Sequence, residues 1–339
     1  MSLVETWERP VVGAPMAGGV SSPLLAAAVS DAGGLGMLAA GYRTPEQVAA
    51  DLVHVRDLTD RPFGVNLFVP RPLDRAALEP RVDDFAGRIA GEAAALGTEV
   101  GLPSWHDTDH WEAKVHLVET LAPPVVSCTF GLPGASVVQR WKGAGCEVHL
   151  TATSVAEAVA AQAAGTDVLV LQGREAGGHR GTHDPSVEPE PVDHLGLLEA
   201  ALPRLGVPAV VAGGVTTPGD VRRALAAGAA GVQVGTAILL AHESGASRTY
   251  RVALRSQHHT ERVLTRAFTG RVAGAVANGW TREYADAPAA FPVVDQLTKP
   301  LRRAAAEQGD LERLHVWAGS GWRAAQERPA GEIVRELAG

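Results

Sequence analysis

The feature that most constrains the fold is a repeated alternation of short apolar runs with longer helical patterns along the first two thirds of the 339-residue chain. Short buried strands joined by crossover helices are what a parallel sheet requires. Eight runs have the length and composition of such strands, and eight parallel strands predict a closed (β/α)8 barrel, the TIM barrel of the α/β class. The expected strands are Val11–Ala14, Leu35–Ala39, Phe63–Val69, Val125–Cys128, Glu147–Leu150, Val168–Leu171, Ala209–Ala212 and Gly231–Val234.

Two stretches fall outside this alternation. Residues 71–122 are too long for one crossover and carry two helical patterns, so we expect a helical insertion after strand three. Residues 245–339 show no strand-like alternation and predict a C-terminal helical cap, whereas residues 1–244 form the barrel. The expected helices are Arg75–Leu96 and Asp109–Leu121 in the insertion, and Arg248–Gln257, Lys299–Glu307 and Glu332–Leu337 in the cap.

The composition of the chain limits the kinds of partner that it can bind. The formal charge of −8 disfavours binding to a nucleic acid backbone, and no apolar run is long enough for a membrane span. Glu5 and Glu8 interrupt the N-terminus before any leader-like segment could form. The two cysteines, Cys128 and Cys146, form no motif and are expected to be buried thiols. We therefore expect a cytoplasmic protein, monomeric or homodimeric, that binds a small molecule.

The loop after the sixth strand, Gln172–His183, contains four glycines and a histidine at position 179. Glycines at this density let a backbone approach a ligand closely, and imidazole exchanges protons near neutral pH. His179 is thus a candidate general base or charge stabiliser beside a cofactor ring. The alternative is a surface turn with an idle histidine.

Two further glycine turns end the seventh and eighth strands. Gly213-Gly214 and Gly235-Thr236 each precede a predicted helix, and this pair of loops is where barrels commonly bind phosphate. Tight strand-to-helix turns are the alternative explanation.

Two residues on other strands suggest a ring cofactor. Asn66 is a polar side chain within an apolar strand, and its amide matches the donors and acceptors of a flavin edge. Met16, after the first strand, could pack against a ring face. Each could equally be a core residue.

Motifs for other chemistry are missing. His179 and His183 are four residues apart, as are His106 and His110, but neither pair has a third ligand in place, so we expect no metal. The chain has no GxSxG elbow, no P-loop and no dinucleotide-binding GxGxxG after a strand.

Taken together, these motifs resemble the nitronate monooxygenase family, formerly 2-nitropropane dioxygenases, over nearly the whole chain. The matching segments include Ala14–Gly19, Asp31–Gly36, Gly64–Phe68, Gln172–Gly181, Ala212–Gly214, Gly231–Thr236, Thr269–Arg271 and Trp317–Gly319. The resemblance implies an FMN-dependent barrel with a helical second domain. From the motifs and the resemblance together, the predicted FMN-binding residues are Met16, Asn66, Gln172, Gly177, Gly178, Gly213, Gly214, Gln233, Val234, Gly235 and Thr236.

The resemblance also implies a reaction. His179 falls at the family's catalytic histidine, and the family oxidises nitronates with O2 to carbonyl compounds and nitrite. A protonated His179 could hold the anionic nitronate, and a neutral His179 could deprotonate a nitroalkane. Thr129 and Lys299 are candidate substrate contacts; Thr129 stands where bacterial members often have histidine.

Two alternatives remain open at the level of sequence. The Glu-Ala-Gly-Gly-His segment is shared with FMN-dependent enoyl-acyl carrier protein reductases, so a reductase that takes hydride from NAD(P)H and reduces an enoyl thioester or quinone has the same motifs. A barrel that has lost its flavin and binds a phosphorylated ligand is the other.

Overall fold

The computed structural model describes residue 4 and residues 7–339, so Glu5, on which part of the leader argument depends, lies outside the described residues. Its centre is an eight-stranded parallel sheet in the order β1-β9-β8-β6-β5-β4-β3-β2. A parallel bridge between Val12 and Leu35 joins the two outer strands and closes the barrel. The strands are β1 Val11–Gly13, β2 Gly36–Ala39, β3 Phe63–Phe68, β4 Val125–Thr129, β5 Glu147–Ala152, β6 Val168–Gln172, β8 Ala209–Ala212 and β9 Gly231–Val234.

All eight predicted barrel strands are therefore confirmed, each within two residues of its expected ends. They could be recognised because the strands of a helix-covered parallel sheet are buried on both faces and consist of continuous apolar runs. Almost every residue in them is buried.

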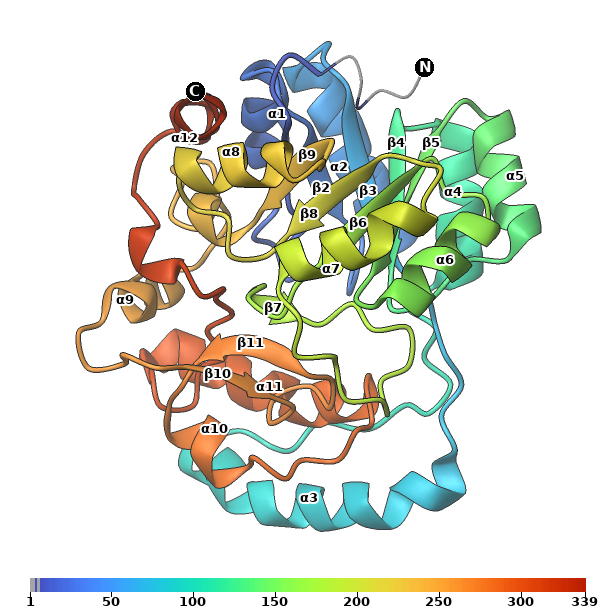
Figure 1. Cartoon of the computed structure of the whole chain (residues 1–339). Helices are drawn as coiled ribbons and strands as arrows, with labels where there is room; N and C mark the ends of the chain where they lie inside the picture. Colours follow the sequence, from blue (N-terminus) through green and yellow to red (C-terminus); the bar gives the residue numbers. More distant parts are fainter. Residues whose placement is uncertain (1–3, 5–6) are drawn as a thin grey trace.

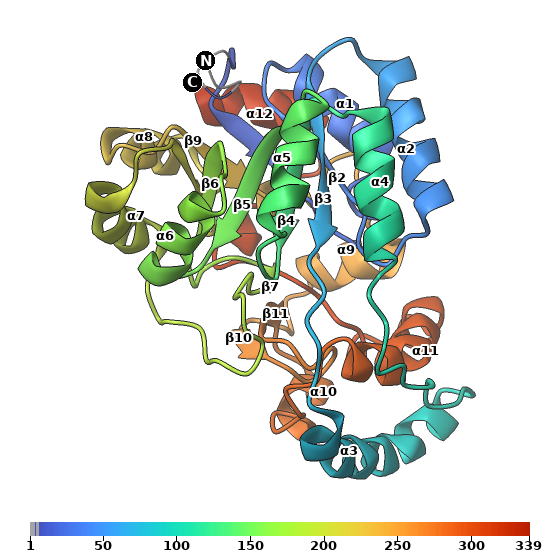
Figure 2. The ribbon, with the colours of Figure 1, turned by 90° about the vertical axis from the view of Figure 1, so that its right-hand side faces the viewer.

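Helices cover the outside of the barrel (Figures 1 and 2). Three of them begin with a hydroxyl N-cap followed by proline, because the cap side chain accepts a free amide and proline has none to satisfy. The surrounding helices are α1 Pro23–Asp31, α2 Pro45–Leu58, α4 Trp111–Leu121, α5 Ala135–Gly143, α6 Val155–Ala163, α7 His194–Ala201, α8 Pro218–Ala226 and α12 Ala330–Ala338.

Two of these helices come from segments that the sequence placed away from the barrel. Helix α4, expected in the insertion, is the crossover between β3 and β4 and contacts α2 and α5. Helix α12, expected in the cap, packs on α1 and α8 (Figure 1). The boundary at residue 244 itself stays a prediction.

A second unit lies below the carboxyl ends of the strands (Figure 1). It contains a three-stranded antiparallel sheet in the order β10-β11-β7 and its own apolar cluster around Phe85, Phe268 and Trp280. Its elements are α3 Arg75–Ala95, β7 Gly178–His179, β10 Arg262–Thr265, β11 Ala273–Val276, α10 Gly279–Glu283 and α11 Val293–Gln308; α9 Arg248–Arg255 lies beside it.

The expectation that residues 245–339 contain no strand was wrong. Strand β11 reads Ala-Gly-Ala-Val and is buried throughout, so neither composition nor alternation marks it as a strand. It forms because it pairs with β10 and with the glycine-rich loop as β7, and such pairing is invisible to a local pattern.

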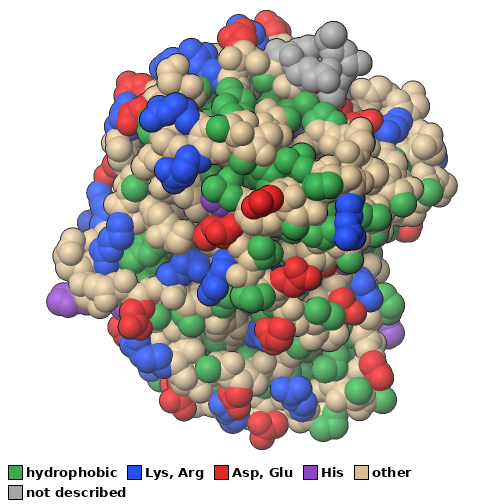
Figure 3. All heavy atoms as spheres, in the orientation of Figure 1, with side chains coloured by type: hydrophobic (Ala, Val, Ile, Leu, Met, Phe, Trp, Pro, Cys, Tyr) green, Lys and Arg blue, Asp and Glu red, His purple; other side chains and the backbone are tan. Residues whose placement is uncertain are grey.

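The charges on the surface are mixed in sign (Figure 3), and both cysteines are buried. On the face shown in Figure 3, acidic and basic side chains are interspersed. Cys128 and Cys146 are free and buried, as expected. None of the helices within the described ranges has the length and apolar character to cross a bilayer.

Candidate active site

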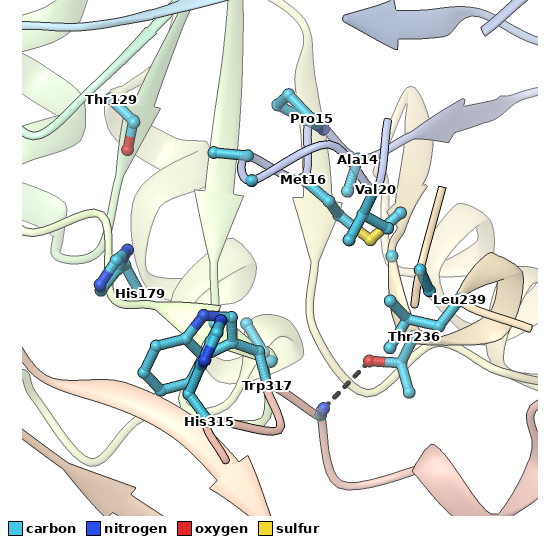
Figure 4. Close-up of a pocket in the computed structure, with 18 of the residues that line it drawn as sticks. Ala14, Pro15, Met16, Val20, Thr129, His179, Thr236, Leu239, His315 and Trp317 are labelled. Atoms are coloured by element: carbon cyan, nitrogen blue, oxygen red, sulfur yellow. Dashed lines mark hydrogen bonds between the residues drawn. The ribbon is translucent and has the colours of Figure 1, made fainter. Parts of the chain in front are cut away.

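A cavity of about 530 Å³ lies where the barrel's carboxyl ends meet the second unit (Figure 4). It brings together thirteen of the fourteen residues predicted from the sequence. These are Met16, Asn66, Thr129, Gln172, Gly177, Gly178, His179, Gly213, Gly214, Gln233, Gly235, Thr236 and Lys299.

Val234 is the exception. Side chains alternate along a strand, so Gln233 and Gly235 face the cavity while the Val234 side chain packs into the barrel's apolar core. Its carbonyl accepts a hydrogen bond of 2.8 Å from the Ala14 amide. Val234 thus supports the loop after β1 and does not line the cavity.

The loops after β8 and β9 form a cradle of bare backbone. Gly213 and Gly214 have φ values of 103° and 73°, a conformation that favours glycine. A Cβ on Gly213 would come within 2.8 Å of the Ala176 nitrogen. Thr236 Oγ1 accepts a hydrogen bond of 3.0 Å from the Gly319 amide and ties this wall to the segment before α12 (Figure 4).

Of the two helices predicted after these turns, one begins with its N-terminus capped by side chains and the other is a single short turn. Thr217 and Asp220 form a capping box at α8, and the Asp220 carboxylate also accepts the Thr216 amide. After β9 the chain makes only the short 3-10 helix Thr236–Ile238. An anion in this cradle would therefore meet the glycine backbone and not the end of an α-helix.

The loop after β6 is held in place from both sides. Gln172 donates to the His179 carbonyl at 3.1 Å and accepts from the Gly181 amide at 2.8 Å. From β10, Arg262 donates to the carbonyls of Arg174 and Ala176 at 2.8 and 2.7 Å. The glycine-rich loop is thus a braced wall of the cavity and not a surface turn.

Gly177 is required by close packing within that wall, because a Cβ there would lie 2.5 Å from the Gly319 nitrogen.

Asn66 is buried, and its amide nitrogen donates to Ser127 Oγ at 2.8 Å. It reaches the cavity from β3 with one amide hydrogen already used by the protein.

His179 lies in an aromatic and cationic environment. Its ring centroid is 5.4 to 5.6 Å from those of Phe130, Phe291 and Trp317, and its Nε2 lies 2.9 Å from Thr269 Oγ1. Burial, followed by the positive charges of Arg271 and Arg302, lowers the pKa of His179 to about 3. At neutral pH this imidazole is uncharged, so it cannot hold an anion as a cation, and one of its ring nitrogens carries a free lone pair.

Two arginines that the sequence analysis did not select add positive charge around His179. The Arg271 guanidinium is buried, lies 4.0 Å from the Phe130 ring centroid and donates to the Thr182 carbonyl at 2.8 Å. Burial lowers its pKa to about 9, which leaves it charged at neutral pH. Arg302, on α11, is paired with the buried Asp295 at 2.6 Å.

His315 is the other residue that was missed. Its ring lines the cavity beside Trp317, with centroids 5.3 Å apart (Figure 4). Burial and the charge of Arg302 place its pKa well below the ordinary value, and its Nδ1 has no hydrogen-bond partner among the residues that the structure describes. The only sequence signal for this side of the site was the likeness of Thr269–Arg271 and Trp317–Gly319 to a known family.

Of the histidines weighed as metal ligands, His183 has a contact with the main chain. His183 Nε2 lies 2.8 Å from the Thr151 carbonyl. Across the residues that the structure describes, no three His, Cys, Asp or Glu side chains are grouped so that they could hold a metal.

A barrel whose strand ends carry a glycine-lined cavity and a buried neutral histidine is an enzyme scaffold with room for a phosphorylated ring cofactor. The family model for nitronate monooxygenase matches residues 2–339. The chain belongs to the nitronate monooxygenase family of oxidoreductases, which are in general flavin-dependent.

Relatives of this family match the chain over nearly its full length. A probable nitronate monooxygenase of Staphylococcus aureus (strain MSSA476) is 35% identical over 335 residues, covering 97% of this chain and 93% of that protein. The structure of a nitroalkane oxidase from Streptomyces ansochromogenes has a TM-score of 0.96 and 44% identity, covering 100% of this chain and 97% of that one. FabK from Thermotoga maritima, at 24% identity, TM-score 0.75 and 98% and 93% coverage, shares the fold.

Proposed function

We propose that this protein binds FMN and oxidises alkyl nitronates with O2 to carbonyl compounds and nitrite, and that it also accepts neutral nitroalkanes. The observation that carries the proposal is the convergence of a bare glycine cradle and an uncharged His179 in one cavity. Membership of the nitronate monooxygenase family and the likeness to a nitroalkane oxidase support the same reaction.

The cavity fits FMN in its donors and in its space. Gly214, Gly235 and Thr236 would hold the phosphate, because glycine backbone brings amides close to an anion without side-chain obstruction. Asn66, Gln172 and Gln233 line the same cavity and offer amide groups to a ring edge. Met16 is placed to pack against a ring face, since its Sδ would lie only 3.5 Å from a Cβ on Gly235.

When bound, FMN supplies the chemistry of accepting electrons from the organic substrate and passing them to O2. The chain's own residues handle charge and protons. Neutral His179 takes the proton from the carbon next to the nitro group, and the positive charges of Arg271 and Arg302 favour the anion that results. A substrate that is already a nitronate has no proton to lose, so it needs only the positive charges of Arg271 and Arg302.

The walls around His179 exclude water. Phe130, Phe291 and Trp317 surround the imidazole, so a proton or anion beside it is not screened by solvent. Thr129 and Lys299 line the cavity and complete the proposed substrate contacts.

The test is to purify the protein, saturate it with FMN and measure O2 uptake and nitrite release with an alkyl nitronate, the parent nitroalkane and, separately, NADH. We expect nitrite from the nitronate without any nicotinamide. O2 uptake that depends on NADH, with no nitrite from either nitro substrate, would contradict the proposal and favour a reductase.

A further inference from the structure

Thr269 occupies an unusual position between His179 and the main chain of Arg271. The residue is 1% exposed, and its Oγ1 lies 2.9 Å from His179 Nε2. The same oxygen lies 3.3 Å from the Arg271 carbonyl oxygen and 3.4 Å from the Arg271 amide nitrogen. One hydroxyl therefore meets three polar groups at a buried position beside the cavity.

A hydroxyl has a single proton to donate, so two arrangements are available. In the first, Thr269 donates to the Arg271 carbonyl and accepts from His179 Nε2–H and from the Arg271 amide, which makes three hydrogen bonds. In the second, Thr269 donates to a bare Nε2, and the Arg271 carbonyl loses its partner.

The need of the Arg271 carbonyl for a donor favours one of these two arrangements of the Thr269 hydroxyl. Arg271 is 2% exposed, and no other donor among the described residues reaches this oxygen. Leaving a buried polar group unsatisfied costs about 1–3 kcal/mol. The first arrangement is therefore favoured.

We propose that Thr269 is a positioning residue that holds His179 in the Nε2–H tautomer, so that Nδ1 carries the lone pair that takes up the substrate proton. The Nδ1 atom makes no hydrogen bond to the described residues, and the ring lines the cavity (Figure 4). In the step, the C–H bond of the nitroalkane breaks, its electron pair moves into the nitro group to give the nitronate, and the proton forms a bond to Nδ1. This inference rests on the proposed function.

The groups that face His179 make the tautomer decisive. Arg271 and Arg302 are positive and disfavour the imidazolium, and His315 across Trp317 is kept neutral by burial. Since the ring is uncharged near neutral pH, only the choice of tautomer determines whether Nδ1, the nitrogen that does not contact Thr269, is a donor or an acceptor.

The direct test is the nitrogen NMR spectrum of the full-length protein as purified, labelled with ¹⁵N-histidine, in which pyrrole-like and pyridine-like ring nitrogens are separated by their shifts. His179→Asn identifies the signals of His179 by their loss. We expect a pyridine-like Nδ1 in the wild type and in Thr269→Ser, and a mixture or reversal in Thr269→Val. A wild-type spectrum with a protonated Nδ1, or an unchanged tautomer in Thr269→Val, would overturn the proposal.

Kinetics provide a second readout. A nitroalkane needs the base and a nitronate does not, so the ratio of nitroalkane to nitronate turnover should fall about tenfold or more in Thr269→Val and recover in Thr269→Ser. An equal loss with both substrates would mean that Thr269 is merely structural. If Thr269→Val does not fold, the wild-type spectrum alone decides. A wild type that oxidises no nitronate would instead refute the proposed function and leave the tautomer result intact.

Discussion

The two walls of the cavity are built on opposite principles. The barrel wall is uncharged and consists largely of backbone, with Gly213, Gly214 and Gly235 at its turns. The wall from the second unit carries charged side chains: Arg302 is paired with the buried Asp295, and the buried Arg271 packs behind it against Phe130. The difference indicates that the barrel provides shape for a cofactor, whereas the second unit sets the charge and protonation of the chemistry.

The largest expected effect is a loss of FMN affinity when a charge is introduced into the barrel wall. Gly235→Asp should weaken FMN binding about 100-fold or more, because a carboxylate would face the phosphate in a site with little water. Gly235→Ala is the matched control: a Cβ there would meet Ala14 Cβ at 3.3 Å and Met16 Sδ at 3.5 Å, so it adds bulk without charge. Fluorescence titration of apoprotein with FMN measures both. Equal losses in the two variants would show that space, and not charge, governs the site.

The next largest effect is the loss of nitroalkane turnover when His179, where the two walls meet, is replaced. His179→Ala should keep FMN but lose about 10² to 10⁴ in nitroalkane turnover, the usual contribution of a general base. Bound flavin is read from the visible spectrum and turnover from nitrite release. Full nitroalkane activity in this variant would remove His179 from the mechanism.

A smaller effect tests the charge of the second unit. Burial, Arg271 and Arg302 together lower the pKa of His179 to about 3, so wild-type nitroalkane turnover should not decline from pH 8 to pH 5 through protonation of this base. Arg271→Met removes one positive charge and should raise the His179 pKa toward its ordinary value. The base is then protonated, and activity lost, as pH falls through that higher pKa. Arg271→Lys retains the charge and should keep the wild-type profile; a decline of the same form in both variants would contradict the electrostatic assignment.

The smallest effect concerns Lys299, which is exposed and lies 6.0 Å from the Tyr42 ring centroid while lining the cavity. An exposed cation steers an anion weakly and in a salt-dependent way. Lys299→Met should raise the KM for a nitronate about two- to fivefold at low salt, with a smaller change at high salt. A KM that does not move at either ionic strength would exclude Lys299 from substrate recognition.

The same two walls differ in how well sequence predicts them. The barrel strands and glycine turns are local patterns, so their positions could be read from the chain directly. Val234 is the predicted cofactor-binding residue that does not line the cavity, and the two-residue period of a strand already places its side chain opposite Gln233 and Gly235.

The second unit could not be predicted in the same way. Strand β11 depends on partners distant in the chain, and Thr269, Arg271 and His315 become functional candidates only when folding places them around His179. The charge of His179 likewise depends on that packing. No local pattern shows that a histidine in a glycine-rich loop is neutral.

The most direct test of the account is an anaerobic visible titration of the FMN-saturated protein with propionate 3-nitronate and, in parallel, with NADH. We expect the nitronate to bleach the flavin absorbance and NADH to do so slowly or not at all. Rapid bleaching by NADH with none by the nitronate would contradict it.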